Sequence, residues 1–191
     1  GVGPGPIAFL GGAGGQLMTE MKSAGISPDE VDVAVFTHLH GDHVGWNLQE
    51  ENGKFWPTFP KARYLIPRGD FEHFTRPEVL ERSAHMGRAV LPLQDLGIME
   101  LVDGGHEVTS EVTLVATPGH TPGHVSIAIA SGDERGFILG DVLNTPAQVE
   151  TPQWSPTFDT DPELARKTRE MILDRLERDK SLVGAGHFLV P

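Results

Sequence analysis

A short apolar run that passes directly into three histidines and an aspartate is the feature that most constrains the fold. Residues 31–36 read VDVAVF, which predicts a buried strand, and residues 37–43 continue as THLHGDH. His38 and His40 are two residues apart, and at a strand end this spacing puts both imidazoles on one face. The pattern therefore predicts a metal site where the strand ends.

The second half of this stretch requires a turn. Asp42 and His43 are neighbours, so in an extended chain they would point to opposite faces. Gly41 permits a turn that brings them to the first pair. Four adjacent ligands would crowd one ion, and two ions fit better, with His38 and His40 on one and Asp42 and His43 on the other. The competing interpretation is a polar loop with surface histidines, because motif matches carry false positives.

The composition limits the partners. Lys and Arg number 15 against 27 Asp and Glu, and the formal charge of −12 argues against nucleic acid and anionic membranes as main partners. The absence of cysteine excludes disulfides and thiolate metal sites; it fits a cytoplasmic protein and is also compatible with export. No apolar run approaches membrane-spanning length. The chain suits a single domain over residues 1–191 that acts on a small molecule, and a homodimer is compatible with it.

Alternating patterns predict a mixed α/β chain. We expect strands at 62–66, 98–102, 108–116, 125–130, 137–139 and 182–186. We expect helices at 16–24, from 43 to about 47, at 71–74 with Asp70 as cap, at 78–90, and from 161 onward. Residues 46–60, rich in aromatics, predict a loop that either forms a substrate wall or packs on its own side chains.

The last helix has the clearest amphipathic pattern. Arg169 is expected to face water, together with its charged neighbours. The expected buried stripe consists of Leu164, Thr168, Met171, Ile172 and Leu176.

Three further candidate ligands each follow a predicted strand. His120 lies in the stretch TPGHTPGH after strand 108–116, Asp141 follows strand 137–139, and His187 follows the last strand. Strand ends of this kind gather residues that are distant in sequence into one cleft.

Together these positions resemble the ordered ligand set of the metallo-β-lactamase superfamily, in the di-metal arrangement of its lactonase, glyoxalase II and organophosphate-hydrolase branches. The resemblance implies a four-layer αβ/βα sandwich with metals at one sheet edge. It gives one metal the ligands His38, His40, His120 and Asp141. It gives the other metal Asp42, His43, Asp141 and His187. His124 and Thr37 are expected to support ligands by hydrogen bonding.

The chain departs from the family pattern in ways that carry further expectations. Only 37 residues precede the motif, and the sequence stops at Pro191 shortly after the last ligand, so the resemblance implies a partial domain truncated at both termini. The stretch 140–161 looks most like the methyl-parathion-hydrolase-like branch. No Tyr follows Asp141 where lactonases often have one, and Asn144 and Thr145 stand nearby instead, which disfavours acyl-homoserine lactones.

Three functional hypotheses follow. The first is a dinuclear hydrolase with two divalent ions, Zn²⁺ foremost, with Mn, Fe or Co as alternatives. A hydroxide bridging the ions would cleave an ester, lactone or phosphotriester, with Asp42 orienting it and shuttling the proton. The second is a mononuclear iron oxidoreductase of persulfide-dioxygenase type on the same fold, with iron held by His38, His120 and Asp141. The third is an inactive metal-binding fragment. The sequence does not identify the substrate-binding residues.

Overall fold

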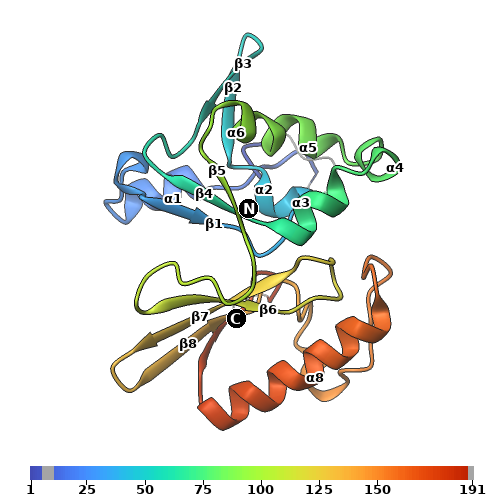
Figure 1. Ribbon diagram of the computed structural model, residues 1–191. Helices are drawn as coiled ribbons and strands as arrows, with labels where there is room; N and C mark the ends of the chain where they lie inside the picture. Colours follow the sequence, from blue (N-terminus) through green and yellow to red (C-terminus); the bar gives the residue numbers. More distant parts are fainter. Residues whose placement is uncertain (6–10, 189–191) are drawn as a thin grey trace. The chain divides into compact units, whose positions relative to one another are not determined.

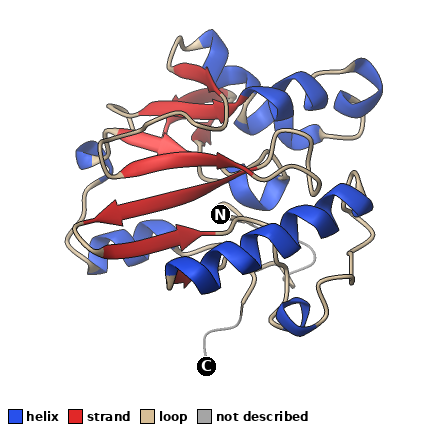
Figure 2. Cartoon of the chain, turned by 60° about the horizontal axis from the view of Figure 1, so that its bottom comes forward, coloured by secondary structure: helices blue, strands red, loops and turns tan. Residues whose placement is uncertain are grey.

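The computed structural model describes residues 1–5 and 11–188. These fall into two units, each assembled from two stretches of chain: unit 1 from Gly1–Ile66 and Phe71–Leu101, and unit 2 from Pro67–Asp70 and Val102–Pro191. Both units combine helices with strands (Figure 2). Among the described residues, every helix is too short or too polar to cross a bilayer.

Unit 1 holds a three-stranded sheet in the order β1-β4-β5 and a separate hairpin of β2 and β3 (Figure 1). Strand β1 pairs with β4 in parallel, and Ala34 lies opposite Tyr64. The strands are β1 (Val33–Val35), β2 (Leu48–Glu51), β3 (Lys54–Pro57), β4 (Arg63–Pro67) and β5 (Met99–Val102). The helices in this part of the chain are α1 (Leu17–Ser23), the 3-10 turn η2 (Pro28–Glu30), α2 (Gly41–Val44), α3 (Arg68–Phe74), α4 (Pro77–Leu80), α5 (Ala84–Ala89) and α6 (Leu91–Asp95).

The core of unit 1 forms around β4, whose residues 64–67 are all buried. Tyr64 is fully buried, so its hydroxyl needs partners. It donates to the Asn47 carbonyl at 3.2 Å and accepts the Phe59 amide at 3.0 Å. Burial raises the pKa of Tyr64, and the Phe59 hydrogen bond opposes that shift. These bonds fix both ends of the segment that carries the β2–β3 hairpin.

That hairpin corrects the prediction of an aromatic loop at residues 46–60. Asn52 and Gly53 both have positive φ, 54° and 74°, at the point where the chain turns between β2 and β3. Asn-Gly between two strand-forming segments is a strong hairpin signal, because both residues tolerate this conformation. The signal was present in the sequence, and the aromatic residues around it obscured it.

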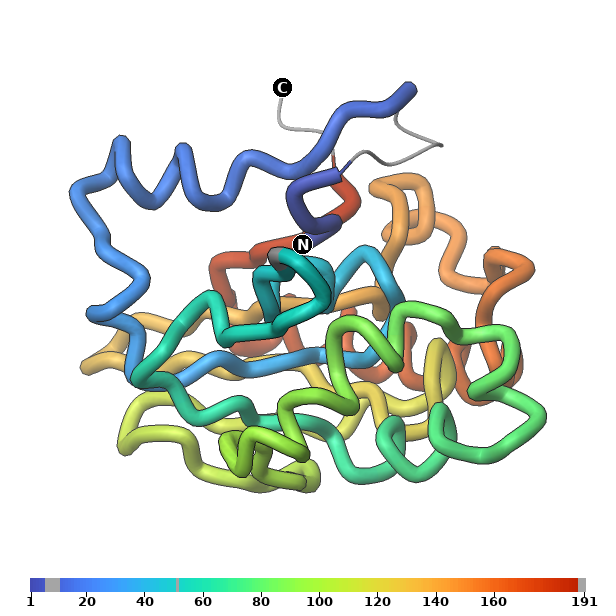
Figure 3. Tube along the Cα trace, turned by 90° about the horizontal axis from the view of Figure 1, so that it is seen from above, coloured from blue at the N-terminus to red at the C-terminus, as the bar shows by residue number. Residues whose placement is uncertain are grey.

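The extents predicted for two helices of unit 1 are also wrong. The helix expected from His43 to about residue 47 is instead α2, which begins at Gly41 and ends at Val44. The helix expected at 78–90 is broken into α4 and α5, and the green part of the trace in Figure 3 changes direction there.

Unit 2 is built on a four-stranded sheet in the order β6-β7-β8-β9. The first two pairings are antiparallel and the β8–β9 pairing is parallel. Its strands are β6 (Val112–Ala116), β7 (Val125–Ser131), β8 (Glu134–Ile138) and β9 (Leu182–Gly184), and its helices are α7 (Ala147–Glu150) and α8 (Pro162–Asp179). Helix α8 runs alongside this sheet (Figure 1). It starts where the Asp161 side chain accepts the Leu164 amide, and it ends at Lys180, which has φ 49°.

The buried face of α8 differs from the predicted stripe. Ala165, Thr168, Arg169 and Ile172 are its buried residues, which is an i, i+3, i+4, i+7 pattern. Met171 is 53% exposed and Leu164 38%. The prediction that Arg169 faces water is therefore wrong: its side chain is fully buried. A charged residue is seldom placed in a core without a partner, which is why the pattern alone did not indicate it.

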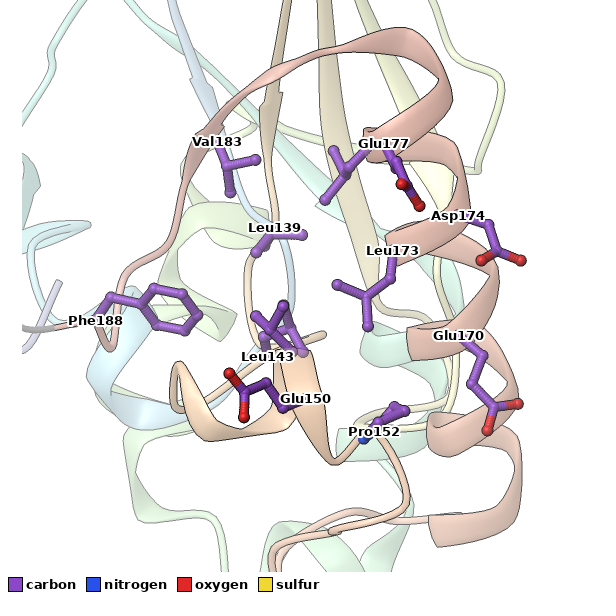
Figure 4. Close-up of a pocket in the computed structure, with 12 residues that line it drawn as sticks. Leu139, Leu143, Glu150, Pro152, Glu170, Leu173, Asp174, Glu177, Val183 and Phe188 are labelled. Atoms are coloured by element: carbon purple, nitrogen blue, oxygen red, sulfur yellow. The ribbon is translucent and has the colours of Figure 1, made fainter.

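An apolar groove of about 700 Å³ lies in unit 2 beside α8 (Figure 4). Leu173 points from the helix toward Leu139 and Leu143, and Glu170 and Asp174 point outward. The described residues that line it include none of the predicted metal ligands. The groove is therefore separate from the candidate chemistry of this unit.

Candidate metal site

In unit 1, the first ligand group lies where β1 gives way to α2. The Phe36 amide still bonds to the Leu65 carbonyl, at 3.2 Å, and the chain then leaves the sheet. His40 is the extended N-cap of α2, and its carbonyl accepts the His43 amide at 3.0 Å. The turn brings the His43 ring to 4.0 Å from that of His38, and the His38 and His40 rings are 4.8 Å apart, measured between centroids. A start of helix therefore gathers these imidazoles, as the motif predicted.

Neighbouring side chains hold this loop. Thr37 Oγ1 lies 3.1 Å from His38 Nδ1, so the hydroxyl contacts the imidazole it was expected to support. His85 Nε2 donates to the Leu39 carbonyl at 2.8 Å, from helix α5. Burial lowers the pKa of His85, and the bond to Leu39 and the charge of Asp42 oppose that shift. His85 therefore packs against the loop that carries the candidate ligands.

In unit 2, two imidazoles approach one carboxylate oxygen. Asp141 Oδ2 is 3.4 Å from His120 Nε2 and 3.1 Å from His187 Nε2. Asn144 Nδ2 donates to the same oxygen at 3.0 Å. His120 and Asp141 are buried, whereas the His187 side chain is 37% exposed. Asn144 thus stands beside the carboxylate near the place where lactonases were noted to carry a tyrosine.

The loop around His120 is clamped on one side by a segment from far earlier in the chain. Asp70 accepts the Thr121 hydroxyl at 2.9 Å and the Gly123 amide at 2.7 Å. A Cβ on Gly123 would lie 2.1 Å from the Asp70 amide nitrogen, so only glycine allows this approach. Asp70 is not the cap of the helix expected at 71–74; it lies within α3, and its carboxylate serves this loop.

The other side of the loop rests on the start of α8. Gly119 has φ 132°, and a Cβ on it would lie 2.3 Å from the Ala165 amide nitrogen. Its carbonyl accepts the Asp161 amide at 2.9 Å, and the Thr168 hydroxyl donates to the Pro118 carbonyl at 2.6 Å. The loop is therefore fixed to the helix through backbone contacts that a larger residue would prevent.

His124 has both ring nitrogens engaged inside unit 2. The Asp141 amide donates to Nε2 at 3.0 Å, so in the neutral ring Nδ1 carries the hydrogen and donates to Thr117 Oγ1 at 2.8 Å. The Thr117 and Ser126 hydroxyls are 3.0 Å apart, and Ser126 donates to the Leu139 carbonyl at 2.9 Å. His124 thus supports the backbone of Asp141.

Two residues of unit 2 that the sequence did not indicate lie behind His120. Its Nδ1 is 2.9 Å from Asp159 Oδ1, and Arg169 Nη2 is 3.4 Å from Asp159 Oδ2. All three side chains are buried. A carboxylate on the far nitrogen is the usual companion of a histidine that binds metal.

The structure therefore presents two groups of candidate ligands, one in each unit. Unit 1 gathers His38, His40, Asp42 and His43; in that group His43 Nε2 lies 3.4 Å from Asp42 Oδ2. Unit 2 gathers His120, Asp141 and His187. Both groups offer imidazole nitrogens and carboxylate oxygens, the donors that Zn²⁺ and similar divalent ions accept. The residues present fit a divalent metal.

Comparison with known proteins decides the family. The model of the metallo-beta-lactamase superfamily matches residues 9–187. The chain belongs to the metallo-β-lactamase superfamily. The predicted resemblance and the α/β class of fold are thereby confirmed.

Relatives within the superfamily are hydrolases. An N-acyl homoserine lactonase of Bacillus thuringiensis is 27% identical over 172 residues, which are 90% of this chain and 62% of the relative. The crystal structure of hydrolase AbOPH superposes with a TM-score of 0.85 at 24% identity, covering 99% of this chain and 68% of its own. The structure of AidC, a dizinc quorum-quenching lactonase in complex with a product, superposes with a TM-score of 0.76 at 22% identity. The match covers 94% of this chain and 65% of that chain. The chain thus spans about three fifths of the length of the Bacillus thuringiensis lactonase it matches.

Proposed function

We propose that this chain forms the metal centre of a dinuclear metal-dependent hydrolase that opens lactones or related esters. The observation that carries the proposal is the group in unit 2, where His120 and His187 approach one oxygen of Asp141 and His120 is backed by Asp159. A carboxylate that faces two imidazoles is suited to bridging two cations. The lactonase names of the relatives favour lactones over phosphotriesters among the substrates first considered.

The proposal requires the two units to act as one domain over residues 1–191. Membership of the superfamily supports this, because the family model runs through both units. The first ion would then have the ligands His38, His40, His120 and Asp141. The second would have Asp42, His43, Asp141 and His187. We propose Zn²⁺ for both, since histidine and aspartate without cysteine suit it, with Mn, Fe and Co as alternatives.

The chemistry divides between the ions and the side chains. When bound, such ions make a water acidic enough to act as a nucleophile at neutral pH and polarise the substrate carbonyl. Asp42 would orient that nucleophile, accept its proton and pass the proton to the leaving oxygen as the ester bond breaks. Asn144 would hold the Asp141 carboxylate in place through its amide, and His124 would hold the Asp141 backbone.

The test combines metal content with turnover. The ions of the purified protein are identified and counted per chain by mass spectrometry, and the protein is then loaded with Zn²⁺ and assayed on acyl-homoserine lactones, other lactones, simple esters and phosphotriesters. We expect two ions per chain and lactone hydrolysis that a chelator removes. A single iron per chain would favour the mononuclear oxidoreductase. Two ions without turnover on any of these substrates would favour an inactive metal-binding fragment.

A further inference from the structure

One buried guanidinium in unit 2 contacts four acceptors. Arg169 Nε donates to the Val142 carbonyl at 2.9 Å, and Nη1 donates to the carbonyls of Pro152 and Trp154 at 2.7 and 3.0 Å. Nη2 donates to Asp159 Oδ2 at 3.4 Å. Burial lowers the pKa of Arg169, and the Asp159 carboxylate opposes that shift. The planar fork of arginine is needed to reach acceptors in these separate directions.

The first of these contacts reaches the backbone beside one ligand. Val142 directly follows Asp141 in the chain, and Arg169 holds its carbonyl from the side of α8. The Asp141 amide is held by His124 Nε2 at 3.0 Å. The backbone is therefore held at two points around Asp141: at its own amide by a histidine, and at the carbonyl of the next residue by the guanidinium.

The fourth contact reaches the other ligand through Asp159. An ionised carboxylate only accepts hydrogen bonds, so His120 Nδ1, 2.9 Å away, carries the hydrogen and donates it. The neutral ring then has its lone pair on Nε2, the atom that lies 3.4 Å from Asp141 Oδ2. The Asp159 side chain is fully buried, and Arg169 Nη2, 3.4 Å from its other oxygen, is its charged partner.

We propose that Arg169 is a positioning residue that sets His120 and Asp141 for the same metal ion. It fixes the tautomer and direction of His120 through Asp159, and it fixes the backbone that carries Asp141 through Val142. The inference rests on the proposed metal site and adds residues that none of the predicted ligand assignments contains. A role in stability alone would leave the Zn²⁺ affinity of the folded protein unchanged when Asp159 or Arg169 is substituted.

The decisive variant is Asp159→Asn, which keeps size and shape. Its amide oxygen would accept from Arg169, so its NH₂ group would face His120 Nδ1 and donate to it. The hydrogen of His120 would then move to Nε2, where it blocks metal binding. Long-range ¹H–¹⁵N spectra of the metal-free protein, with His120 assigned by substitution, should show the Nδ1–H tautomer in the wild type and the Nε2–H tautomer in Asp159→Asn.

Metal affinity gives the second readout. Zn²⁺ is titrated against a chromophoric chelator with wild type, Asp159→Asn, Arg169→Lys and the control Arg166→Lys. Arg166 lies on the same helix, but it forms a partly exposed ion pair with Glu170. We expect about 10–100-fold weaker binding in the first two variants, as for other residues that orient metal ligands, and an unchanged affinity in the control.

The two readouts separate the possible failures. Wild-type tautomer and wild-type affinity in both Asp159→Asn and Arg169→Lys would overturn the inference. If Arg169→Lys does not fold, Asp159→Asn alone decides, because it retains every hydrogen-bonding position. If wild type binds no Zn²⁺ but shows the tautomer switch, the proposed metal function fails, and with it the inference that the switch serves a metal. If the wild type binds Zn²⁺ and the tautomer of His120 does not change in Asp159→Asn, only the inference about Arg169 fails.

Discussion

The two loops that carry the proposed ligands bring their side chains together in different ways. In unit 1, four proposed ligands occupy six consecutive residues, and one turn of helix at Gly41–Val44 gathers them. In unit 2, His120, Asp141 and His187 are dispersed over 68 residues and depend on buried polar partners from other segments. A contiguous group needs little more than a backbone turn, whereas a dispersed group needs a scaffold of hydrogen bonds behind it.

The difference has a consequence for what substitutions do. Around the unit 1 loop, a change is expected to act mainly through the ligand itself or through its local packing. Around the unit 2 loop, substitutions of residues outside the proposed ligand set should also have measurable effects, because their buried partners would be left unsatisfied. The following expectations test this contrast.

The largest effect is expected at Asp141. Asp141→Ala removes a ligand from both proposed ions and leaves two close positive charges unscreened, so metal content should fall at both sites and hydrolysis should nearly vanish. His124→Ala should keep measurable metal and some turnover, with a loss of about 10–100-fold. The metal content of both variants, measured by mass spectrometry and compared with wild type, tests these two expectations. Two retained ions in Asp141→Ala, with one lost in His124→Ala, would reverse the two roles.

Gly119→Ala should destabilise unit 2 strongly. Its φ of 132° is a conformation that only glycine readily adopts, and the added Cβ would lie 2.3 Å from the Ala165 amide nitrogen. We expect a loss of about 3 kcal/mol in the free energy of unfolding, measured with urea. Gly186→Ala is the matched control, since its Cβ would meet no atom within 4 Å. Equal stability of the two variants would contradict the close approach of loop and helix.

His85 should make the stability of unit 1 depend on pH. Its lowered pKa means that the unfolded chain binds the proton more readily than the folded one, so His85 favours folding fully above the unfolded value of about 6.5 and loses that contribution as pH falls through it. In metal-free protein, His85→Gln should reduce the loss of stability between about pH 7.5 and about pH 5.5. An identical pH dependence in wild type and variant would show that His85 titrates normally in the folded state.

The smallest effect is expected in helix α5 and has the opposite sign. Gly87 lies inside this helix, and a Cβ there would meet nothing within 4 Å. Gly87→Ala should therefore stabilise the protein by about 0.5–1 kcal/mol, since alanine loses less backbone freedom on folding. The free energies of unfolding of Gly87→Ala and Gly119→Ala, measured with urea, give the comparison directly. A destabilised Gly87→Ala would mean that α5 is packed more tightly than its surroundings indicate.

The sequence predicted those parts of the fold whose signal is local. The strand ahead of His38 and the start of α8 at Asp161 both depend on residues within a few positions, and both are observed. The family followed from the order of the ligands along the chain. The Asn52-Gly53 turn had an equally local signal, and it was missed because aromatic residues suggested a loop.

What the sequence could not show depends on partners far away in the chain. Arg169 looked like a solvent-facing residue because nothing in its helix indicates the carbonyls and the carboxylate that surround it. Asp159 has a partner 39 residues earlier, and Asp70 has partners 51 and 53 residues later. Such bonds satisfy buried polar groups only once the tertiary structure exists.

The four residues Pro67–Asp70 also bear on how this protein can be made and dissected. They belong to unit 2, although the chain on both sides of them belongs to unit 1. A fragment beginning at Val102 would lack Asp70, and the Thr121 hydroxyl and Gly123 amide would lose their acceptor. During synthesis, this acceptor emerges from the ribosome about 50 residues before the loop that it must hold, so the closure of that loop is a late, long-range step. The second unit should consequently be unable to mature as an independent piece.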